Sequence, residues 1–195
     1  MRKLLIIYAL IFAENFIKIC EVNMKTIVVY KSKTGYTKRY AQWIAEELNC
    51  DIKENPSLSD IMGYDTIIFG GGMYAGGMNG ARLITKNLEK LSGKKLVLFA
   101  VGSNPGKDKD IIPFWNRLIP AEQQKSIGHF YLRGGFDFNR LGTADKILMN
   151  MLKMRLQKIE NPDEDTLGLL AAYDNPVDFT DKDNIKELID YVRTV

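Results

Sequence analysis

The sequence predicts an α/β domain with a doubly wound parallel sheet. Two observations carry this prediction: short β-branched and apolar runs alternate with segments of helical spacing from residue 24 onward, and no segment repeats or has low complexity. Strands that alternate with helices form parallel sheets with right-handed crossovers. The 195 residues fit one such domain with an insertion better than two domains.

Five segments have the pattern of strands. Residues 26–30, Thr-Ile-Val-Val-Tyr, form a run typical of a strand buried on both faces, and residues 51–53 form a short edge strand. Residues 66–69 and 96–101 are further buried strands that end at glycine, and residues 129–132 are the fifth strand.

Five segments are expected to be helices. Residues 37–48 carry apolar side chains at helical spacing, and residues 81–91 show a similar pattern. A short helix is expected over residues 114–118, a long one over residues 143–159, and a closing helix over residues 184–192. The long helix therefore lies in an insertion between the last strand and the last helix.

Composition excludes several classes of protein. The chain is 46% hydrophobic and 26% charged, with a formal net charge of +3, so it can form a core and lacks the strong basicity of a nucleic-acid-binding protein. Its only cysteines are Cys20 and Cys50, and His129 is its only histidine. These exclude a zinc site of Cys and His ligands and a disulfide framework, so a cytoplasmic protein without a bound metal is expected.

Residues 1–23 are set apart from this pattern. Their charged start and the apolar run at residues 4–13 resemble a secretory signal, but the run is too short to span a bilayer and no clear cleavage site follows. We expect instead that Met24, directly before the first strand, is the true start. Residues 1–23 are then a mis-assigned or disordered extension, with a signal or membrane anchor as the alternative, and the domain spans residues 24–195.

The predicted sheet locates the functional site before any family is considered. Ligands of open parallel sheets bind beyond the carboxyl ends of the strands. The loops there are residues 31–36, 70–77, 102–106 and 133–136, and three of the four are rich in glycine that we do not expect packing to require.

The first of these loops has the chemistry of a phosphate site. Its hydroxyl groups and backbone N–H groups can donate hydrogen bonds at a helix N-terminus, and Gly35 permits a backbone shape that a Cβ would hinder. The spacing matches neither a nucleotide triphosphate loop nor a dinucleotide fingerprint, and an ordinary helix cap is the alternative. The candidate residues are Ser32, Lys33, Thr34, Gly35, Tyr36 and Thr37.

This loop resembles the FMN phosphate loop of flavodoxins, whose pattern is [Ser/Thr]-x-[Ser/Thr]-Gly-x-[Ser/Thr]. The resemblance covers residues 24–195 and implies FMN as the cofactor. It also implies a flavodoxin-like doubly wound five-stranded parallel sheet, with strand order 2-1-3-4-5 and a helical insertion before the last helix.

The resemblance assigns two further loops to the flavin ring. Tyr74 is the expected stacking partner of the isoalloxazine ring, with packing on the glycines of its own loop as the alternative. Backbone amides of the third loop are expected at the pyrimidine edge. The candidate residues are Gly72, Met73, Tyr74, Ala75 and Gly76 in the second loop and Gly102, Ser103 and Asn104 in the third.

Two features favour an enzyme over a simple electron carrier. Carrier flavodoxins are typically strongly acidic, whereas this chain is slightly basic. The segment Lys146 to Ile159 is apolar, rich in methionine and basic, so it could face a membrane, a quinone or a hydrophobic partner. The alternative is a helix packed onto the domain, since its apolar residues cover more than one face.

This region is loosely similar to that of the flavodoxin-type protoporphyrinogen dehydrogenases, which use menaquinone. The similarity implies an FMN-dependent oxidoreductase acting on a small organic substrate, such as a quinone or tetrapyrrole, in the cytoplasm or peripheral to the membrane. Arg133, Lys107 and Lys109 could then bind a substrate carboxylate, with simple solvation as the alternative. The other function considered is a soluble electron carrier that docks on a redox partner protein. Neither function involves nucleic acid, and no catalytic residue is identified.

Overall fold

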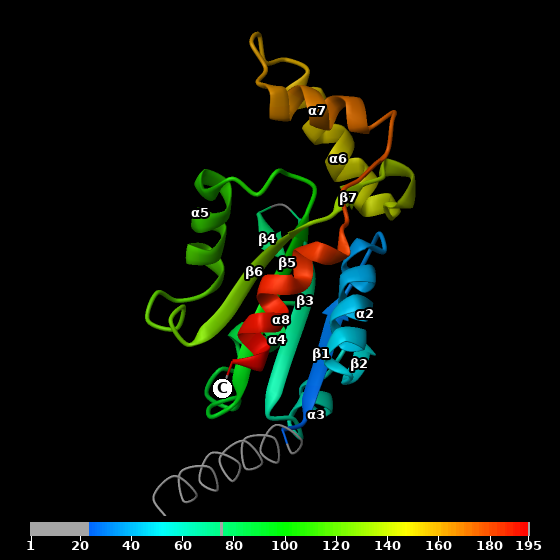
Figure 1. Cartoon of the computed structure of the whole chain (residues 1–195). Helices are drawn as coiled ribbons and strands as arrows, with labels where there is room; N and C mark the ends of the chain where they lie inside the picture. Colours follow the sequence, from blue (N-terminus) through cyan, green and yellow to red (C-terminus); the bar gives the residue numbers. More distant parts are fainter. Residues whose placement is uncertain (1–23, 75, 195) are drawn as a thin grey trace, which may run out of the picture.

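A computed structural model describes residues 24–74 and 76–194, and the proposed extension 1–23 and Ala75 lie outside these described residues. Its centre is a sheet in the order β2-β1-β3-β5-β6 (Figure 1). The parallel strands are β1 (Thr26–Lys31), β2 (Asp51–Glu54), β3 (Thr66–Tyr74), β5 (Lys95–Gly102) and β6 (Ile127–Arg133). Numbered along the chain, these five strands have the predicted order 2-1-3-4-5, which is confirmed.

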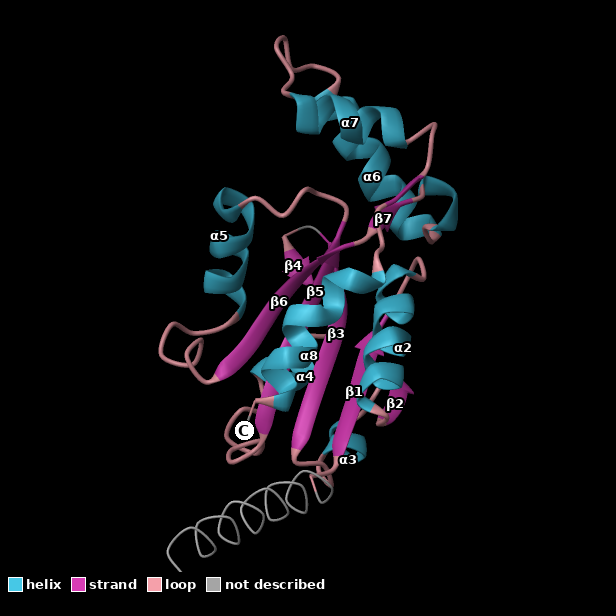
Figure 2. Cartoon of the chain, viewed as in Figure 1, coloured by secondary structure: helices cyan, strands magenta, loops and turns pink. Residues whose placement is uncertain are grey.

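Helices cover both faces of the sheet, as a doubly wound domain requires (Figure 2). One face carries α2 (Tyr36–Leu48) and α8 (Lys186–Arg193), preceded by the short helix η2 (Lys182–Ile185). The other carries α3 (Leu58–Ile61), α4 (Arg82–Thr85) and α5 (Asp108–Leu118). Alternate residues of β1 enter the two cores: Val28 packs under α2, and Val29 packs on the opposite side. Burial on both faces explains why the strands are continuous apolar runs.

The predicted insertion is present and lies beyond the carboxyl ends of the strands (Figure 1). It contains β7 (Gly135–Phe136), η1 (Phe138–Arg140), α6 (Thr143–Leu156), α7 (Glu164–Ala172) and β8 (Val177–Asp178). Strands β7 and β8 pair in an antiparallel ribbon that carries the chain out of the domain and back. The sequence analysis missed α7, although Asp163 marks its start by accepting a hydrogen bond from the Thr166 N–H.

Two predicted helices have the wrong length. The segment predicted at residues 81–91 forms only α4, because the side chain of Asn87 donates to the Leu83 carbonyl (2.9 Å) and turns follow. The helix predicted at residues 114–118 begins earlier, at Asp108, and includes Pro113 in its interior.

The glycine run at the end of the third strand was also misread. Residues 70–72 belong to β3 itself, which extends to Tyr74 and pairs with β5 and with the short strand β4 (Gly77–Met78). The ring of Phe99 occupies the space where a side chain at Gly70 would lie, since a Cβ there would be 2.1 Å from the ring. Packing therefore does require glycine at this position.

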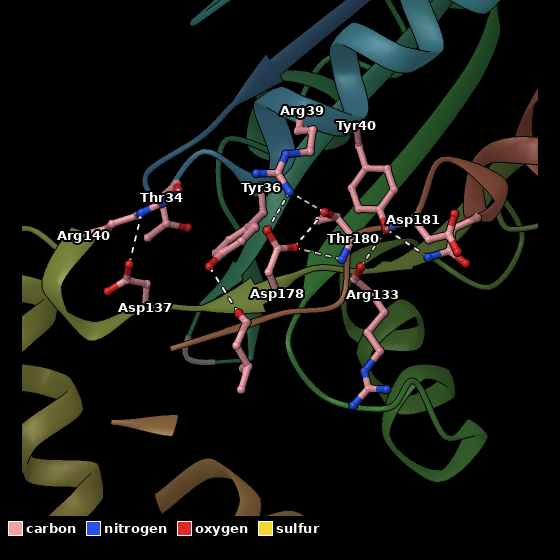
Figure 3. Close-up of polar contacts among 12 residues, drawn as sticks. Thr34, Tyr36, Arg39, Tyr40, Arg133, Asp137, Arg140, Asp178, Thr180 and Asp181 are labelled. Carbon is pink, nitrogen blue, oxygen red and sulfur yellow. Dashed lines mark hydrogen bonds and ion pairs between the residues drawn. The ribbon is translucent and has the colours of Figure 1, made fainter. Parts of the chain in front are cut away.

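A polar network fixes the return of the chain from the insertion onto α2 (Figure 3). The buried Tyr40 hydroxyl donates to the Arg133 carbonyl (2.7 Å) and accepts from the Asp181 N–H (3.2 Å) and the Asn184 amide (3.0 Å). One residue earlier, Arg39 binds the Asp178 carboxylate at 2.6 Å. These contacts hold the last residue of β6 and the start of η2 together.

Among residues 24–74 and 76–194, no helix combines the length and the apolar character that crossing a bilayer requires.

We predict that Tyr40→Phe destabilises the domain by about 1–3 kcal/mol, because the substitution leaves a buried carbonyl and two donors without their partner. Urea unfolding followed by circular dichroism measures this change. Tyr191→Phe is the matched control, because Tyr191 is exposed and its hydroxyl makes no hydrogen bond within the described residues. Equal midpoints for the two variants would contradict the role assigned to the Tyr40 hydroxyl.

Candidate functional site

The predicted phosphate loop forms a tight turn between β1 and α2. Gly35 has φ 95°, in the left-handed region, and its N–H donates to the Ser32 hydroxyl oxygen (3.1 Å). The first bond of the helix runs from the Arg39 N–H to the Gly35 carbonyl (3.0 Å). The N–H groups of Tyr36, Thr37 and Lys38 have no acceptor within the described residues, so they remain free for an anion at the helix N-terminus.

The hydroxyl-bearing residues of the loop have different positions. Thr34 and the buried Thr37 line a small cavity, whereas Ser32 closes the turn. The ring of Tyr36 also lines the cavity, and its hydroxyl donates to the Val177 carbonyl (3.3 Å). Burial raises the pKa of Tyr36. Tyr36 therefore joins the loop to the insertion in addition to forming the wall of the site.

Lys33 links the phosphate loop to the insertion and to the second loop. Its Nζ lies 2.7 Å from both carboxylate oxygens of Asp145, in the first turn of α6. The same Nζ lies 4.6 Å from the ring centroid of Tyr74. This places a cation beside the hydroxyls and the ring.

The second predicted loop brings Tyr74 to the phosphate loop. Gly72, Met73 and Tyr74 line the small cavity, while Gly76 lies away from it and faces Arg117. The Tyr74 ring packs against Gly72, since a Cβ on that glycine would be 2.6 Å from the ring. Burial raises the pKa of Tyr74, and a hydrogen bond with the Thr34 side chain opposes this effect. The ring thus packs on a glycine of its own loop and also forms part of the cavity wall.

The third predicted loop closes the opposite wall. Gly102 and Ser103 line the small cavity, and Ser103 and Asn104 line its neighbour. The Tyr131 hydroxyl donates to the Asn104 carbonyl (2.7 Å), and the Asn104 side chain accepts from the Gly106 N–H (3.3 Å). Burial raises the pKa of Tyr131, which keeps this hydroxyl a donor. The side chain of Tyr131, in β6, therefore fixes the position of this loop.

The small cavity has a volume of about 170 Å³, and part of its wall was not predicted. The missed residues come from the insertion, which the sequence pattern could not place over the sheet. They are Gly135, Phe136, Asp137, Leu141, Asp145, Leu148, Met149 and Leu169. Two signals in the sequence pointed to part of this set: the loop at residues 133–136 was expected at the carboxyl edge, and the segment Lys146–Ile159 was offered as a contact for a quinone, a membrane or a hydrophobic partner.

A second, larger cavity of about 640 Å³ adjoins the first. The two share Ser103, Phe136 and Leu169, and the larger one lies between the third loop, the end of β6 and α7. Ordinary ligand pockets measure roughly 300–1,000 Å³. The larger cavity falls in this range, and the smaller one is below it.

The donors of the phosphate loop fit the phosphate of FMN. Two hydroxyl-bearing residues line the small cavity at the helix N-terminus with its free N–H groups, and Lys33 lies beside the Tyr74 ring of the same cavity. Its volume is too small to enclose a flavin ring, so the cavity must widen. No residue of α6 is buried, so a movement of this wall would break fewer buried contacts than a movement of the strands or of α2.

The charges around the loop are mixed. Arg140 donates to the Thr34 carbonyl (3.4 Å) and pairs with Asp137 at 3.1 Å (Figure 3). Asp137 and Asp145 also line the cavity, so a phosphate dianion would approach two carboxylates. Within the described residues, no group of His, Cys, Asp and Glu side chains is arranged to hold a metal ion.

We predict that Asp145→Asn tightens FMN binding about threefold, roughly 0.6 kcal/mol, because the substitution removes a repelling carboxylate and frees Lys33 for the phosphate. Titration of the apoprotein by flavin fluorescence measures the affinity. Asp174→Asn is the control, since Asp174 is 80% exposed and makes only a 3.7 Å contact with Lys153. Weaker binding by the Asp145 variant would show that the Lys33–Asp145 pair supports the bound state.

The solved structures to which this chain is similar are distant from it in sequence. No curated protein was found to match the chain. Among solved structures, the Trp repressor binding protein from Bacillus subtilis is 17% identical and covers 76% of this chain and 94% of its own, with a TM-score of 0.43. Oxidised flavodoxin 1 from Bacillus cereus is 15% identical, covering 70% and 99%, with a TM-score of 0.40. A flavoprotein in complex with FMN from Lactobacillus acidophilus NCFM is 18% identical, covering 56% and 93%, with a TM-score of 0.36.

A family model supplies the assignment. The model described as a flavodoxin domain matches residues 27–163, which is more than half of the 195 residues. The matched segment contains all three predicted loops and the start of the insertion. The chain belongs to the flavodoxin domain family.

Proposed function

We propose that this protein is an FMN-dependent oxidoreductase that passes electrons between FMN and a small organic substrate of the quinone or tetrapyrrole type. Membership in the flavodoxin domain family supports FMN as the cofactor. The observation that carries the enzyme proposal is the pair of adjoining cavities at the carboxyl edge. One presents donors for a phosphate, and the other has room for a separate organic molecule.

The residues of the site have distinct tasks in this proposal. The hydroxyls of Thr34 and Thr37 and the free N–H groups of α2 bind the phosphate, and Tyr74 orients the ring. Helices α6 and α7 limit the access of water to the carboxyl edge (Figure 1). FMN, when bound, supplies one- or two-electron redox chemistry, and the chain supplies its position and surroundings.

The alternative is an electron carrier that docks on a redox partner protein and has no substrate of its own. The flavodoxin domain favours neither alternative. The insertion argues for the enzyme, because it covers the edge of the sheet at which a bare flavin domain would present the cofactor to a partner. The net charge of +3 supports the same choice.

We predict that the purified protein is yellow and yields FMN on extraction; recovery of FAD, or of no flavin, would overturn the proposal.

Gly35→Ala should weaken FMN binding about tenfold, since alanine at φ 95° costs roughly 1–2 kcal/mol. Gly63→Ala is the matched control, because nothing lies within 4 Å of a Cβ there and its φ is ordinary.

Substrate turnover separates enzyme from carrier. The FMN-loaded protein is reduced with dithionite and mixed without oxygen with menadione, and flavin absorbance is followed against free FMN at the same concentration. An enzyme should transfer electrons to the quinone faster than free FMN does. A rate no higher than that of free FMN, for quinones and for porphyrinogen oxidation alike, would leave the carrier as the function.

We also propose that the protein is cytoplasmic and contacts an anionic membrane surface through the segment Lys146–Ile159. Ile147, Met151 and Met154 share one face of α6 and are 60%, 54% and 61% exposed. Arg155, also exposed, adds a positive charge beside them. An apolar face with a basic flank suits the interface of an anionic lipid bilayer.

Vesicle flotation tests this contact. The protein should float with phosphatidylglycerol vesicles and much less with phosphatidylcholine vesicles, and Met151→Glu should abolish flotation. Lys125→Glu, a surface change far from α6, is the control. Failure of the wild-type protein to float would refute the membrane contact without affecting the flavin proposal.

A further inference from the structure

The position of Arg133 is fixed by its backbone. It is the last residue of β6, paired with Gly102 of the third flavin loop. Its carbonyl accepts from the Tyr40 hydroxyl (2.7 Å), and the next N–H, of Gly134, donates to the Gly102 carbonyl (2.7 Å). Figure 3 shows the Arg133 side chain leaving this network on the side away from Tyr40. The direction of the side chain is therefore set by the sheet.

The Nε of Arg133 has no hydrogen-bond partner within the part of the chain that the structure describes. The guanidinium group lies over the ring of Phe179, with Cζ 3.7 Å from the ring centroid. The Nε is buried, and no carboxylate pairs with the guanidinium group within residues 24–74 and 76–194. An arginine N–H buried without an acceptor is costly, so this position suits an anion supplied from outside the chain.

The cavity beside Arg133 is largely apolar. Phe136, Leu156, Leu169 and Ala172 line it, together with Phe179. These side chains offer contact surface to a molecule with an apolar body, which free phosphate lacks.

Four carboxylates also line this cavity, and two of them, Asp163 and Asp165, are already engaged, whereas Asp110 and Glu164 form no ion pair within the described residues. Asp165 pairs with Lys107 at 2.6 Å, and Asp163 caps α7 by accepting from the Thr166 N–H (2.9 Å). Lys107 and Lys109 lower the pKa of Asp163 in addition to that hydrogen bond. None of the four carboxylates pairs with Arg133 within the described residues, so a ligand carboxylate can bind its guanidinium group without breaking an ion pair.

We propose that the larger cavity binds an amphipathic organic acid, in which one carboxylate pairs with Arg133 and an apolar body lies against Leu169 and Phe136. Both of these residues also line the small cavity, so the apolar body would reach the flavin. This proposal rests on the proposed function and narrows its substrate class to apolar molecules that carry an anionic group. Arg133 is a binding residue here.

Matched probes test the proposal on the FMN-saturated protein. Titration calorimetry compares 2-naphthoate with the neutral 2-naphthamide, which has the same ring system. The wild-type protein should bind the carboxylate at least tenfold more tightly than the amide. Arg133→Gln should remove this preference while keeping the amide affinity, Arg133→Lys should keep part of it, and Arg155→Gln, on the exposed face of α6, should not change it.

Three results would overturn the proposal: no carboxylate preference in the wild-type protein, the same preference in Arg133→Gln, or displacement of naphthoate by FMN. FMN affinity, measured in parallel, shows separately whether the flavin proposal fails. If Arg133→Gln does not fold, NMR of the wild-type protein with bound naphthoate shows where the ligand lies. Contacts from naphthoate to the methyl groups of Leu169 and Ala172 would support the site, and contacts restricted to the methionines of α6 would refute it.

Discussion

The carboxyl edge of the sheet depends on the hydroxyl group of Tyr40. This one buried group binds the last residue of β6, where the chain leaves the domain, and Asp181, where it returns. The insertion is therefore closed at its base by α2, the helix whose N-terminus forms the phosphate loop. Any change at this point alters the phosphate loop, the direction of Arg133 and the position of the insertion together.

Above this base, the insertion is fastened to the domain mainly by surface contacts. Three ion pairs each join one residue of the domain to one of the insertion: Lys33–Asp145, Arg39–Asp178 and Lys107–Asp165. Exposed ion pairs contribute little to the free energy of folding and are screened by salt. In addition, no residue of α6 is buried, so this helix adds little apolar packing. The insertion is thus the least strongly held wall of both cavities, which is what a site that must widen to admit a flavin requires.

The same arrangement explains how one edge can offer two kinds of binding. Thr34 and Thr37 face the small cavity from a helix N-terminus, where backbone donors favour a phosphate. Arg133 faces the larger cavity from the end of a strand, among apolar side chains. The two cavities meet at Leu169 and Phe136, so a cofactor in one and an organic acid in the other would touch.

The sequence by itself determined the five strands and the three loops at the carboxyl edge, because β-branched runs and glycine turns depend on neighbours along the chain. The order of the strands came from the resemblance to flavodoxins. The sequence analysis misread Gly70 as loop, since only the tertiary structure shows the Phe99 ring that requires it. It named Arg133 without deciding between a ligand site and solvation. Only the folded chain places α6 and α7 beyond the carboxyl edge of the sheet (Figure 1) and leaves the Nε of Arg133 buried without a partner in the described residues, because contacts between residues far apart in sequence have no local pattern.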